Sequence, residues 1–354
     1  MRGRRLSLLV ALTLVGPAMA AAQQAPQIAK PRPAPPGPST VLPLPTASFD
    51  NTLSIGGDDI RARKVGTRMT VDTHVNGRGP YRFVVDSGAD TSVVGLRIAH
   101  DLALPLGRPA ILNGTTDRSI VDRVKVDQLA LGRSAITDLE LPALREQDLG
   151  GEGMVGIDAL VNQRLMMDFE KKVIKIEDAR LPDHFDPGAI VITARRRHGQ
   201  LILTQVRAAG LSLDAVIDTG SEVSIGNVAL RNKLIRGNRD KFWTVEATGV
   251  TGVTKTMQMA LIGELKIGPI TLHNVPIAFG DVPPFEVFGL SKQPSLLLGT
   301  DLLGTFRRVS LDFRARKVRF QLKRCNSEGM VIRTSPTDSF SRMSSMGGIE
   351  VCQR

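Results

Sequence analysis

The sequence predicts an all-β protein that contains two similar lobes in one chain. The chain is 42% hydrophobic but only 4% aromatic, so its core must come mainly from short runs of Val, Leu and Ile, which favour strands. The stretches "FVVDSGAD" at 83–90 and "AVIDTGSE" at 215–222 share one pattern, and similar segments follow both. We therefore expect two duplicated β-lobes with few and short helices.

The first lobe is expected to begin near Val65 with a hairpin. The alternation of Met69 and Val71 with polar neighbours is typical of a half-buried strand. Turn residues at 76–80 then lead into the strand that ends at Asp86. This strand carries the first copy of the repeated pattern.

The duplication extends well beyond the two motifs, whose Asp residues are separated by 218 − 86 = 132 positions. Five further pairs of segments follow in the same order: a helix-like segment (96–104 and 227–235), a Gly-containing loop (113–119 and 248–255), two strand-like stretches (126–142 and 262–278), an apolar-Gly-x-Asp segment (154–160 and 296–303) and a closing hairpin (166–177 and 310–322). Two similar units in one chain can pack about a pseudo-twofold axis, as the subunits of a symmetric dimer do.

The remaining segments predict export. Arg2, Arg4 and Arg5 precede an apolar run at 6–15 and a small-x-small site at 18–20, which is typical of a secretory signal peptide and too short to span a bilayer. We expect a periplasmic or secreted protein with no integral membrane segment after cleavage. The expected division is a signal peptide at 1–22, a Pro-rich spacer at 23–64, an N-terminal lobe at 65–180, a linker at 181–198, a C-terminal lobe at 199–323 and a tail at 324–354.

The two cysteines, Cys325 and Cys352, both lie in the tail. Export to an oxidising compartment predicts a disulfide between them, and the alternative is two unpaired thiols.

Several classes of partner are not supported by the sequence. The net charge is +11, or 11 − 3 = +8 without residues 1–20, but the basic residues are scattered and no stacking aromatics or helix-turn-helix pattern accompanies them, so no nucleic-acid partner is expected. The five His residues are dispersed and no H-E-x-x-H occurs, so no metal is expected. "GEGMVG" at 151–156 matches the dinucleotide fingerprint, but its last Gly belongs to a repeated segment, so no cofactor is expected.

The motifs "VVDSGAD" and "VIDTGSE", with "MVGID" and "LLGTD" downstream, resemble the retropepsin-like aspartic protease family. They are most similar to the exported bacterial members with two tandem units, and the resemblance covers residues 65–323. It implies two retropepsin-like β-lobes with a catalytic cleft between them. It also implies an aspartic endopeptidase that needs no cofactor, acts on a protein or peptide and works as a monomeric pseudo-dimer.

The resemblance assigns site residues in both motifs. It makes Asp86 and Asp218 the catalytic dyad, and it gives supporting or substrate-binding roles to two further sets: Ser87, Gly88, Thr219 and Gly220 as supports of the dyad, and Ala89, Asp90, Ser221 and Glu222 as substrate contacts. Two carboxylates about 3 Å apart share one proton, so one takes a proton from water while the other donates one. The loops 113–119 and 248–255 would be flaps over the cleft.

Two alternatives remain open. The chain could be a peptide-binding protein of the same fold without turnover, although the presence of both Asp residues favours an enzyme. It could also be a protease that acts only as an intermolecular dimer. The link at 180–194 reaches about 45 Å when extended, which makes closure within one chain feasible. The natural substrate and the cleavage-site preference are not predicted.

Overall fold

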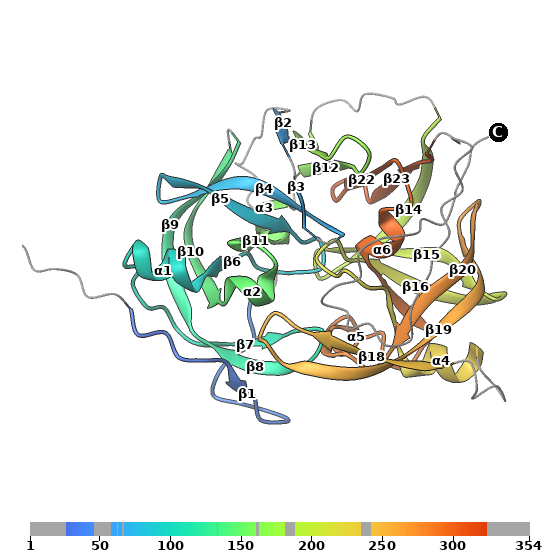
Figure 1. Cartoon of the computed structure of the whole chain (residues 1–354), viewed down its shortest axis with the longest axis horizontal. Coiled ribbons are helices and arrows are strands. Elements are labelled where there is room, and N and C mark those ends of the chain that lie inside the picture. The colour runs from blue at the N-terminus through green and yellow to red at the C-terminus, as the bar shows by residue number, and fades with distance from the viewer. Residues whose placement is uncertain are drawn as a thin grey trace, which may run out of the picture.

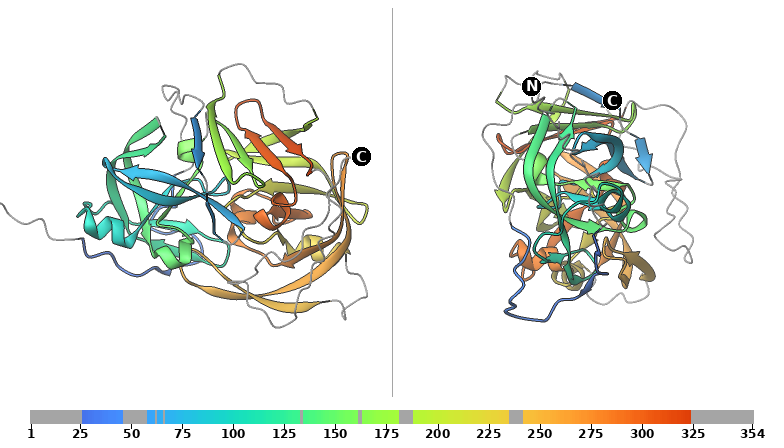
Figure 2. Two further views of the ribbon diagram at one scale, coloured as in Figure 1. Left: turned by 45° about the horizontal axis from the view of Figure 1, so that its top comes forward. Right: turned by 90° about the vertical axis from the view of Figure 1, so that its left-hand side faces the viewer.

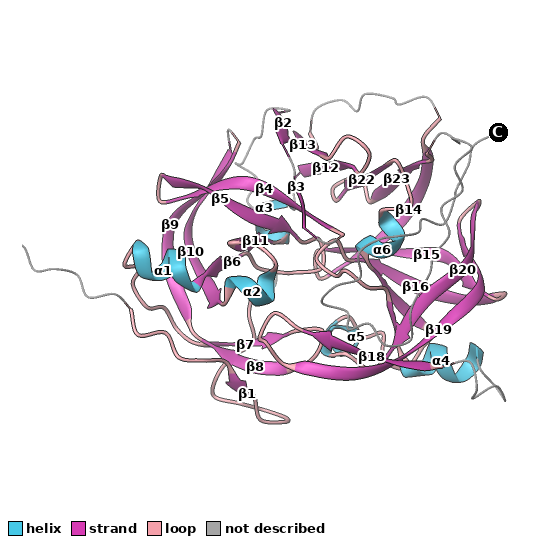
Figure 3. Ribbon diagram, viewed as in Figure 1, coloured by secondary structure: helices cyan, strands magenta, loops and turns pink. Residues whose placement is uncertain are grey.

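The computed structural model describes residues 26–45, 58–61, 63–65, 67–132, 134–160, 163–180, 188–234 and 242–323, and strands predominate in it (Figure 3). The expected signal peptide at 1–22 and the tail at 324–354, with both cysteines, lie outside these residues. Among the described helices, none is long and apolar enough to cross a membrane.

The first lobe is a closed barrel of six strands. Their order is β4-β5-β11-β6-β10-β9, and a pairing of β4 with β9 closes the barrel. The strands are β4 (Arg68–Val75), β5 (Arg78–Val85), β6 (Val93–Gly95), β9 (Arg123–Leu131), β10 (Ser134–Leu144) and β11 (Gly153–Val155). The short helices are α1 (Leu96–Asp101), α2 (Glu146–Leu149) and α3 (Ile157–Leu160). The predicted hairpin is present, and Asn76 and Gly77 form its turn with φ of 48° and 72°.

The second lobe repeats this barrel. Its order is β15-β16-β21-β17-β20-β19, and a pairing of β15 with β19 closes the barrel. Strand by strand, this repeats the order of the first lobe (Figure 1). The strands are β15 (Gln200–Ala208), β16 (Leu211–Ile217), β17 (Ile225–Gly226), β19 (Thr254–Ile267), β20 (Ile270–Phe279) and β21 (Ser295–Leu298), and the helices are α4 (Val228–Leu234), α5 (Pro283–Val287) and α6 (Thr300–Leu303). The prediction of two similar all-β lobes is confirmed.

The closing hairpins of the two halves pair with each other instead of covering separate lobes. β12 (Gln163–Asp168) and β13 (Val173–Asp178) form the first hairpin, and β22 (Arg308–Asp312) and β23 (Lys317–Gln321) form the second. β12 runs antiparallel to β22, and they form one sheet across the boundary between the lobes (Figure 2). We call these four strands the joint sheet.

The structure differs from the expected linker at residues 190–197. This segment is strand β14 (Ile190–Arg197), which pairs with β23 and β15. Ile192 and Ala194 are buried, whereas Arg195, Arg196 and Arg197 are exposed. The run of arginines suggested a solvated connection, but the alternation before it is that of a half-buried strand.

The expected Pro-rich spacer also contributes strands. β2 (Asp58–Arg61) pairs with β13, and β3 (Arg63–Val65) pairs with β4. β1 (Arg32–Pro33) pairs with β8 (Arg118–Val121), which forms a hairpin with β7 (Ala110–Asn113). The part of the spacer that the structure describes is therefore integrated into the folded protein.

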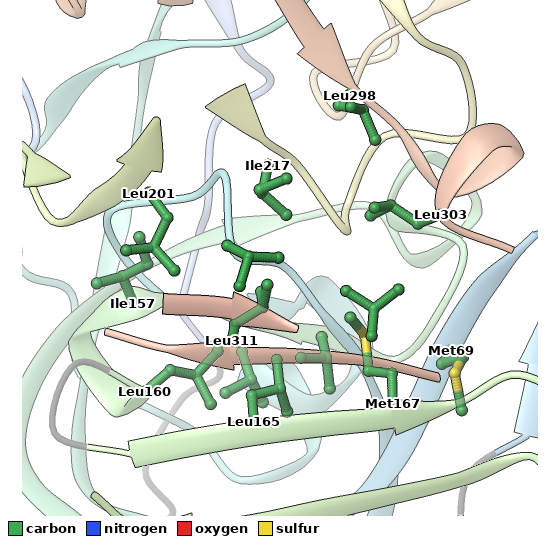
Figure 4. Packing of buried hydrophobic residues seen from close by; sticks show 14 of the residues in the cluster. Met69, Ile157, Leu160, Leu165, Met167, Leu201, Ile217, Leu298, Leu303 and Leu311 are labelled. Carbon is green, nitrogen blue, oxygen red and sulfur yellow. The ribbon is translucent and has the colours of Figure 1, made fainter. Parts of the chain in front are cut away.

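One large hydrophobic core connects the lobes through the joint sheet. Figure 4 shows side chains of both halves packed there, and its labelled residues are Met69, Ile157, Leu160, Leu165, Met167, Leu201, Ile217, Leu298, Leu303 and Leu311. Because the two lobes share this core, neither can rotate freely, and the opposed edges of the barrels keep a defined geometry.

Candidate active site

Both motif loops lie where the two barrels face each other. β5 ends at Val85 and β16 ends at Ile217, so Asp86 and Asp218 each follow a strand whose last residues are buried. β11 and β21, which carry the apolar-Gly segments of the repeat, run parallel to these strands. The Asp86 N–H donates to the carbonyl of Val155 at 2.9 Å, and the Asp218 N–H makes the equivalent bond within the second lobe. The repeated Gly-x-Asp segment therefore holds the end of each motif strand.

Ser87 and Thr219 tie the two loops together across the lobes. The Ser87 N–H donates to Thr219 Oγ1 at 2.9 Å, and the Thr219 N–H donates to Ser87 Oγ at 3.2 Å. Each hydroxyl then donates to the main chain of the opposite lobe, Ser87 Oγ to Ile217 at 3.0 Å and Thr219 Oγ1 to Val85 at 2.8 Å. All four bonds cross the lobe boundary, so the two Asp residues are positioned relative to each other.

The two carboxyl groups are held in matching ways. Asp86 Oδ1 accepts hydrogen bonds from the N–H groups of Gly88 and Ala89 at 2.7 and 3.1 Å. Asp218 Oδ1 accepts the equivalent bonds from Gly220 and Ser221 at 3.1 and 3.0 Å. Each carboxyl also lies beside the motif glycine of the opposite lobe, Asp86 beside Gly220 and Asp218 beside Gly88.

The glycines of the motifs permit this close approach. A Cβ atom on Gly88 would lie 2.7 Å from Cγ of Asp218, and a Cβ atom on Gly220 would overlap the carboxyl of Asp86. Each glycine therefore faces the acid of the opposite lobe, and a side chain at either position would push the dyad apart.

Burial raises both pKa values, and the charge of the neighbouring carboxyl adds to the rise at Asp218. Burial raises the pKa of Asp86 above its ordinary value, although the N–H groups of Gly88 and Ala89 act against the rise. Burial, followed by the charge of Asp86, raises the pKa of Asp218 to about 8. Like charges this close cannot both ionise readily, so the pair retains one proton over a wide pH range.

A cavity of about 670 Å³ opens above the two carboxyls. Its walls come from both motif loops and from the hairpin tips that the sequence predicts as flaps. The first tip lies between β7 and β8, and the second lies between β18 (Trp243–Thr248) and β19. Thr251 Oγ1 donates to Asp117 Oδ1 at 2.5 Å, so the two tips touch across the lobes. The cavity is thus covered on the side of the flaps.

Asp90 and Glu222 also line the cavity, but their partners differ. Arg68 Nε of the first lobe lies 3.3 Å from Glu222 Oε1 of the second. In the equivalent place, Gln200 Nε2 of the second lobe donates to Asp90 Oδ1 of the first at 2.6 Å. One cross-lobe contact is an ion pair, and the other is a hydrogen bond from a side-chain amide to a carboxyl. The two ends of the cavity are therefore not equivalent.

The partners Arg68 and Gln200 were not predicted, but they occupy equivalent positions because 68 + 132 = 200. The same offset relates Ser92 to Ser224, whose hydroxyls each donate at 2.7 Å to an acid of the Gly-x-Asp segments. Those acids are Asp158 and Asp301. The repeat could have identified all of these positions, although it could not show which residues meet across the lobes.

The site offers two coupled carboxyls in a covered cleft. Within the part of the chain that the structure describes, no group of three or more His, Cys, Asp or Glu side chains is arranged to hold a metal ion. A family model described as aspartyl protease matches the chain at 71–159 and again at 204–302, which together cover more than half of its length. The chain belongs to the aspartyl protease family. No curated protein matches the chain.

Proposed function

We propose that the chain is an aspartic endopeptidase that hydrolyses peptide bonds with a water molecule activated between Asp86 and Asp218. The observation that carries the proposal is the meeting of the two buried carboxyls, one from each lobe, beneath a cavity that both lobes line. The family match supports peptide hydrolysis as the reaction class.

The geometry suits general acid–base catalysis. In the singly protonated dyad, the ionised carboxyl takes a proton from water as the water oxygen attacks the peptide carbonyl carbon. The protonated carboxyl donates its proton to the carbonyl oxygen. In the second step one carboxyl donates its proton to the amide nitrogen while the other takes a proton from a hydroxyl of the gem-diol. The C–N bond breaks, a carboxylic acid and an amine are released, and the pair is again singly protonated. The N–H donors on Oδ1 of each Asp keep both carboxyls in place throughout.

The flaps and the cross-lobe contacts would position an extended peptide in the cleft. Asp90 and Glu222 line the cavity on either side of the dyad, where their carboxyls are available to main-chain N–H groups of the substrate. Ala89 and Ser221 would contribute as N–H donors to the dyad and as walls of the cavity. The shared core and joint sheet favour a monomer whose two lobes form one site. We further propose that it acts in the periplasm or outside the cell.

The test is the digestion of unfolded casein at mildly acidic pH, with and without pepstatin, followed by mass spectrometry of the products. We expect internal cleavages that pepstatin suppresses and that are missing with Asp86→Asn. Binding of casein without any cleavage by the wild type would contradict the proposal and support a peptide-binding protein instead.

A further inference from the structure

Residues 26–45, hereafter the strap, lie against the flap hairpin of the first lobe (Figure 1). β1 in the strap pairs antiparallel with β8. Beyond it, the Ala34 N–H donates to the carbonyl of Arg118 at 2.9 Å, and Nη1 of Arg118 donates to the carbonyl of Pro35 at 2.6 Å. The strap therefore occupies the outer edge of β8.

The same strap then turns and pairs with the other edge of the hairpin. The Ile111 N–H in β7 donates to the carbonyl of Leu42 at 2.8 Å, and the Leu44 N–H donates to the carbonyl of Ile111 at 3.0 Å. Addition of an extended chain to a free strand edge is a general mode of peptide recognition. One segment thus holds both edges of the flap that covers the proposed active site.

The two leucines of the strap differ in exposure. Leu42 is 72% exposed, whereas Leu44 is half-buried. Leu44 packs against an apolar cluster beneath the flap, whose buried members are Val84, Val93, Leu112, Val121, Leu144, Leu149 and Met154. Leu44 and Pro43 also line the cavity that contains Asp86 and Asp218. The strap therefore supplies part of the wall of the cleft itself.

Proline limits how the strap can pair. Pro43 and Pro45 flank Leu44 and have no N–H, so Leu44 supplies the one donor of this tripeptide. That donor is used by β7. The pairing therefore ends at the flap edge and does not recruit a further strand.

We propose that the strap is an internal occupant of the substrate site, in which Leu44 fills a position for an apolar side chain of an extended peptide and restrains the first flap. Release of residues 42–44 from β7 would free the strand edge and the apolar position together. Substrates with a Leu-like residue in an extended segment would compete for this place. The effect on cleavage rests on the proposed function, whereas the docking of the strap does not.

Docking is tested in the full chain with two matched variants, Leu44→Glu at the half-buried position and Leu42→Glu at the exposed one. We expect amide hydrogen exchange at Ile111 to be about tenfold faster in Leu44→Glu, because loss of the buried part of a leucine side chain weakens the docking equilibrium by about this factor. A fluorescent peptide with the sequence of residues 38–45, "PSTVLPLP", should bind to Leu44→Glu in a polarisation assay. The wild type and Leu42→Glu should show neither change, because their site is already occupied.

Equal exchange at Ile111 in all three proteins, or no binding of the peptide to Leu44→Glu, would overturn the inference. Circular dichroism checks the fold of each variant. If Leu44→Glu is disordered, Leu44→Ala takes its place with the same expected direction and a smaller effect.

Cleavage gives the second measurement. With an apolar peptide substrate, kcat/KM should rise about tenfold in Leu44→Glu, mainly through a lower KM, and should not change in Leu42→Glu. Peptide binding to Leu44→Glu without cleavage by any of the proteins would support the strap and contradict the proposed endopeptidase. Equal cleavage by all three proteins without peptide binding would leave the endopeptidase supported and the role of the strap refuted.

Discussion

Arg308 of the second lobe donates a hydrogen bond of 2.6 Å to Asp168 of the first lobe. The reciprocal pair joins Arg164 of the first lobe to Asp312 of the second at 3.2 Å. The pairs are related by the repeat, since 308 − 164 and 312 − 168 both equal 144. They lie at opposite ends of the β12–β22 pairing, with Met166 opposite Ser310 between them. The joint sheet therefore carries the pseudo-twofold symmetry of the whole molecule.

This relationship predicts that Asp168→Ala destabilises the protein. Its carboxyl is 1% exposed, and the substitution leaves the guanidinium of Arg308 without this acceptor, so we expect a loss of about 3 kcal/mol in the free energy of unfolding. Glu264→Ala, which removes a carboxylate that is 37% exposed and pairs with Lys266, should change it by less than about 0.5 kcal/mol. Urea denaturation measures both. Equal losses would show that the cross-lobe pair does not stabilise the joint sheet.

Asp86→Asn and Asp218→Asn should each abolish cleavage while the chain stays folded. An Asn side chain keeps the shape of the carboxyl but cannot exchange the proton. Because the two acids share one proton and act as a unit, the double variant should be no less active than either single variant. Initial rates on a fluorogenic peptide, with a wild-type pH profile that falls on both sides of its optimum, check this. Loss of activity with only one substitution would indicate that the lobes do not form a common site.

Gly220→Ala should also abolish cleavage, by displacing the carboxyl of Asp86. The added Cβ atom would overlap that carboxyl, which cannot move without breaking its bonds to Gly88 and Ala89. The matched control is Gly263→Ala in β19, where an added Cβ meets no atom within 4 Å. It should retain wild-type kcat/KM. Full activity in Gly220→Ala would contradict the close approach of the two loops.

The sequence predicted the parts of the site that depend on local pattern. An apolar run that ends in Asp, a hydroxyl residue and Gly identifies each motif loop, and Gly-containing hairpin tips identify the flaps at 113–119 and 248–255. The motifs and the tips both recur in the second half in the same order, so two weak patterns became one strong prediction. The positions of both loops beside one cavity agree with it.

The cross-lobe contacts could not be predicted in the same way. Arg68 and Glu222 are 222 − 68 = 154 positions apart, and only the assembled lobes bring their side chains together. Composition likewise predicts that residues 26–45 are extended, but it does not predict the surface on which they lie. In β14, three exposed arginines obscured a strand that has only two buried side chains, Ile192 and Ala194.

Asp218→Asn should stabilise the folded protein more as the pH rises. Burial and the charge of Asp86 raise the folded-state pKa of Asp218 from 3.8 to about 8. Folding is therefore most favourable where this group is protonated in both states, below pH 3.8, and stability is lost as the pH rises toward 8. An Asn side chain does not titrate, so Asp218→Asn does not lose this stability as the pH rises. The melting temperature of Asp218→Asn minus that of the wild type should increase from about pH 4 to about pH 8, and a constant difference would contradict the raised pKa.

Substitutions at Gln200 should move the pKa of Asp90 in opposite directions. Burial raises this pKa. The hydrogen bond from the side-chain amide of Gln200 is the largest influence that lowers it, ahead of the charge of His198. Gln200→Leu removes the donor and should raise the pKa further. Gln200→Arg reproduces the guanidinium that faces Glu222 at the other end of the cavity, so it should lower the pKa below that of the wild type. NMR titration of the Asp90 carboxyl carbon measures this pKa in the wild type and in both variants. The order Leu above Gln above Arg would show that Gln200 sets the difference between the two ends of the cleft, whereas an unchanged pKa in both variants would show that this cross-lobe bond does not form in solution.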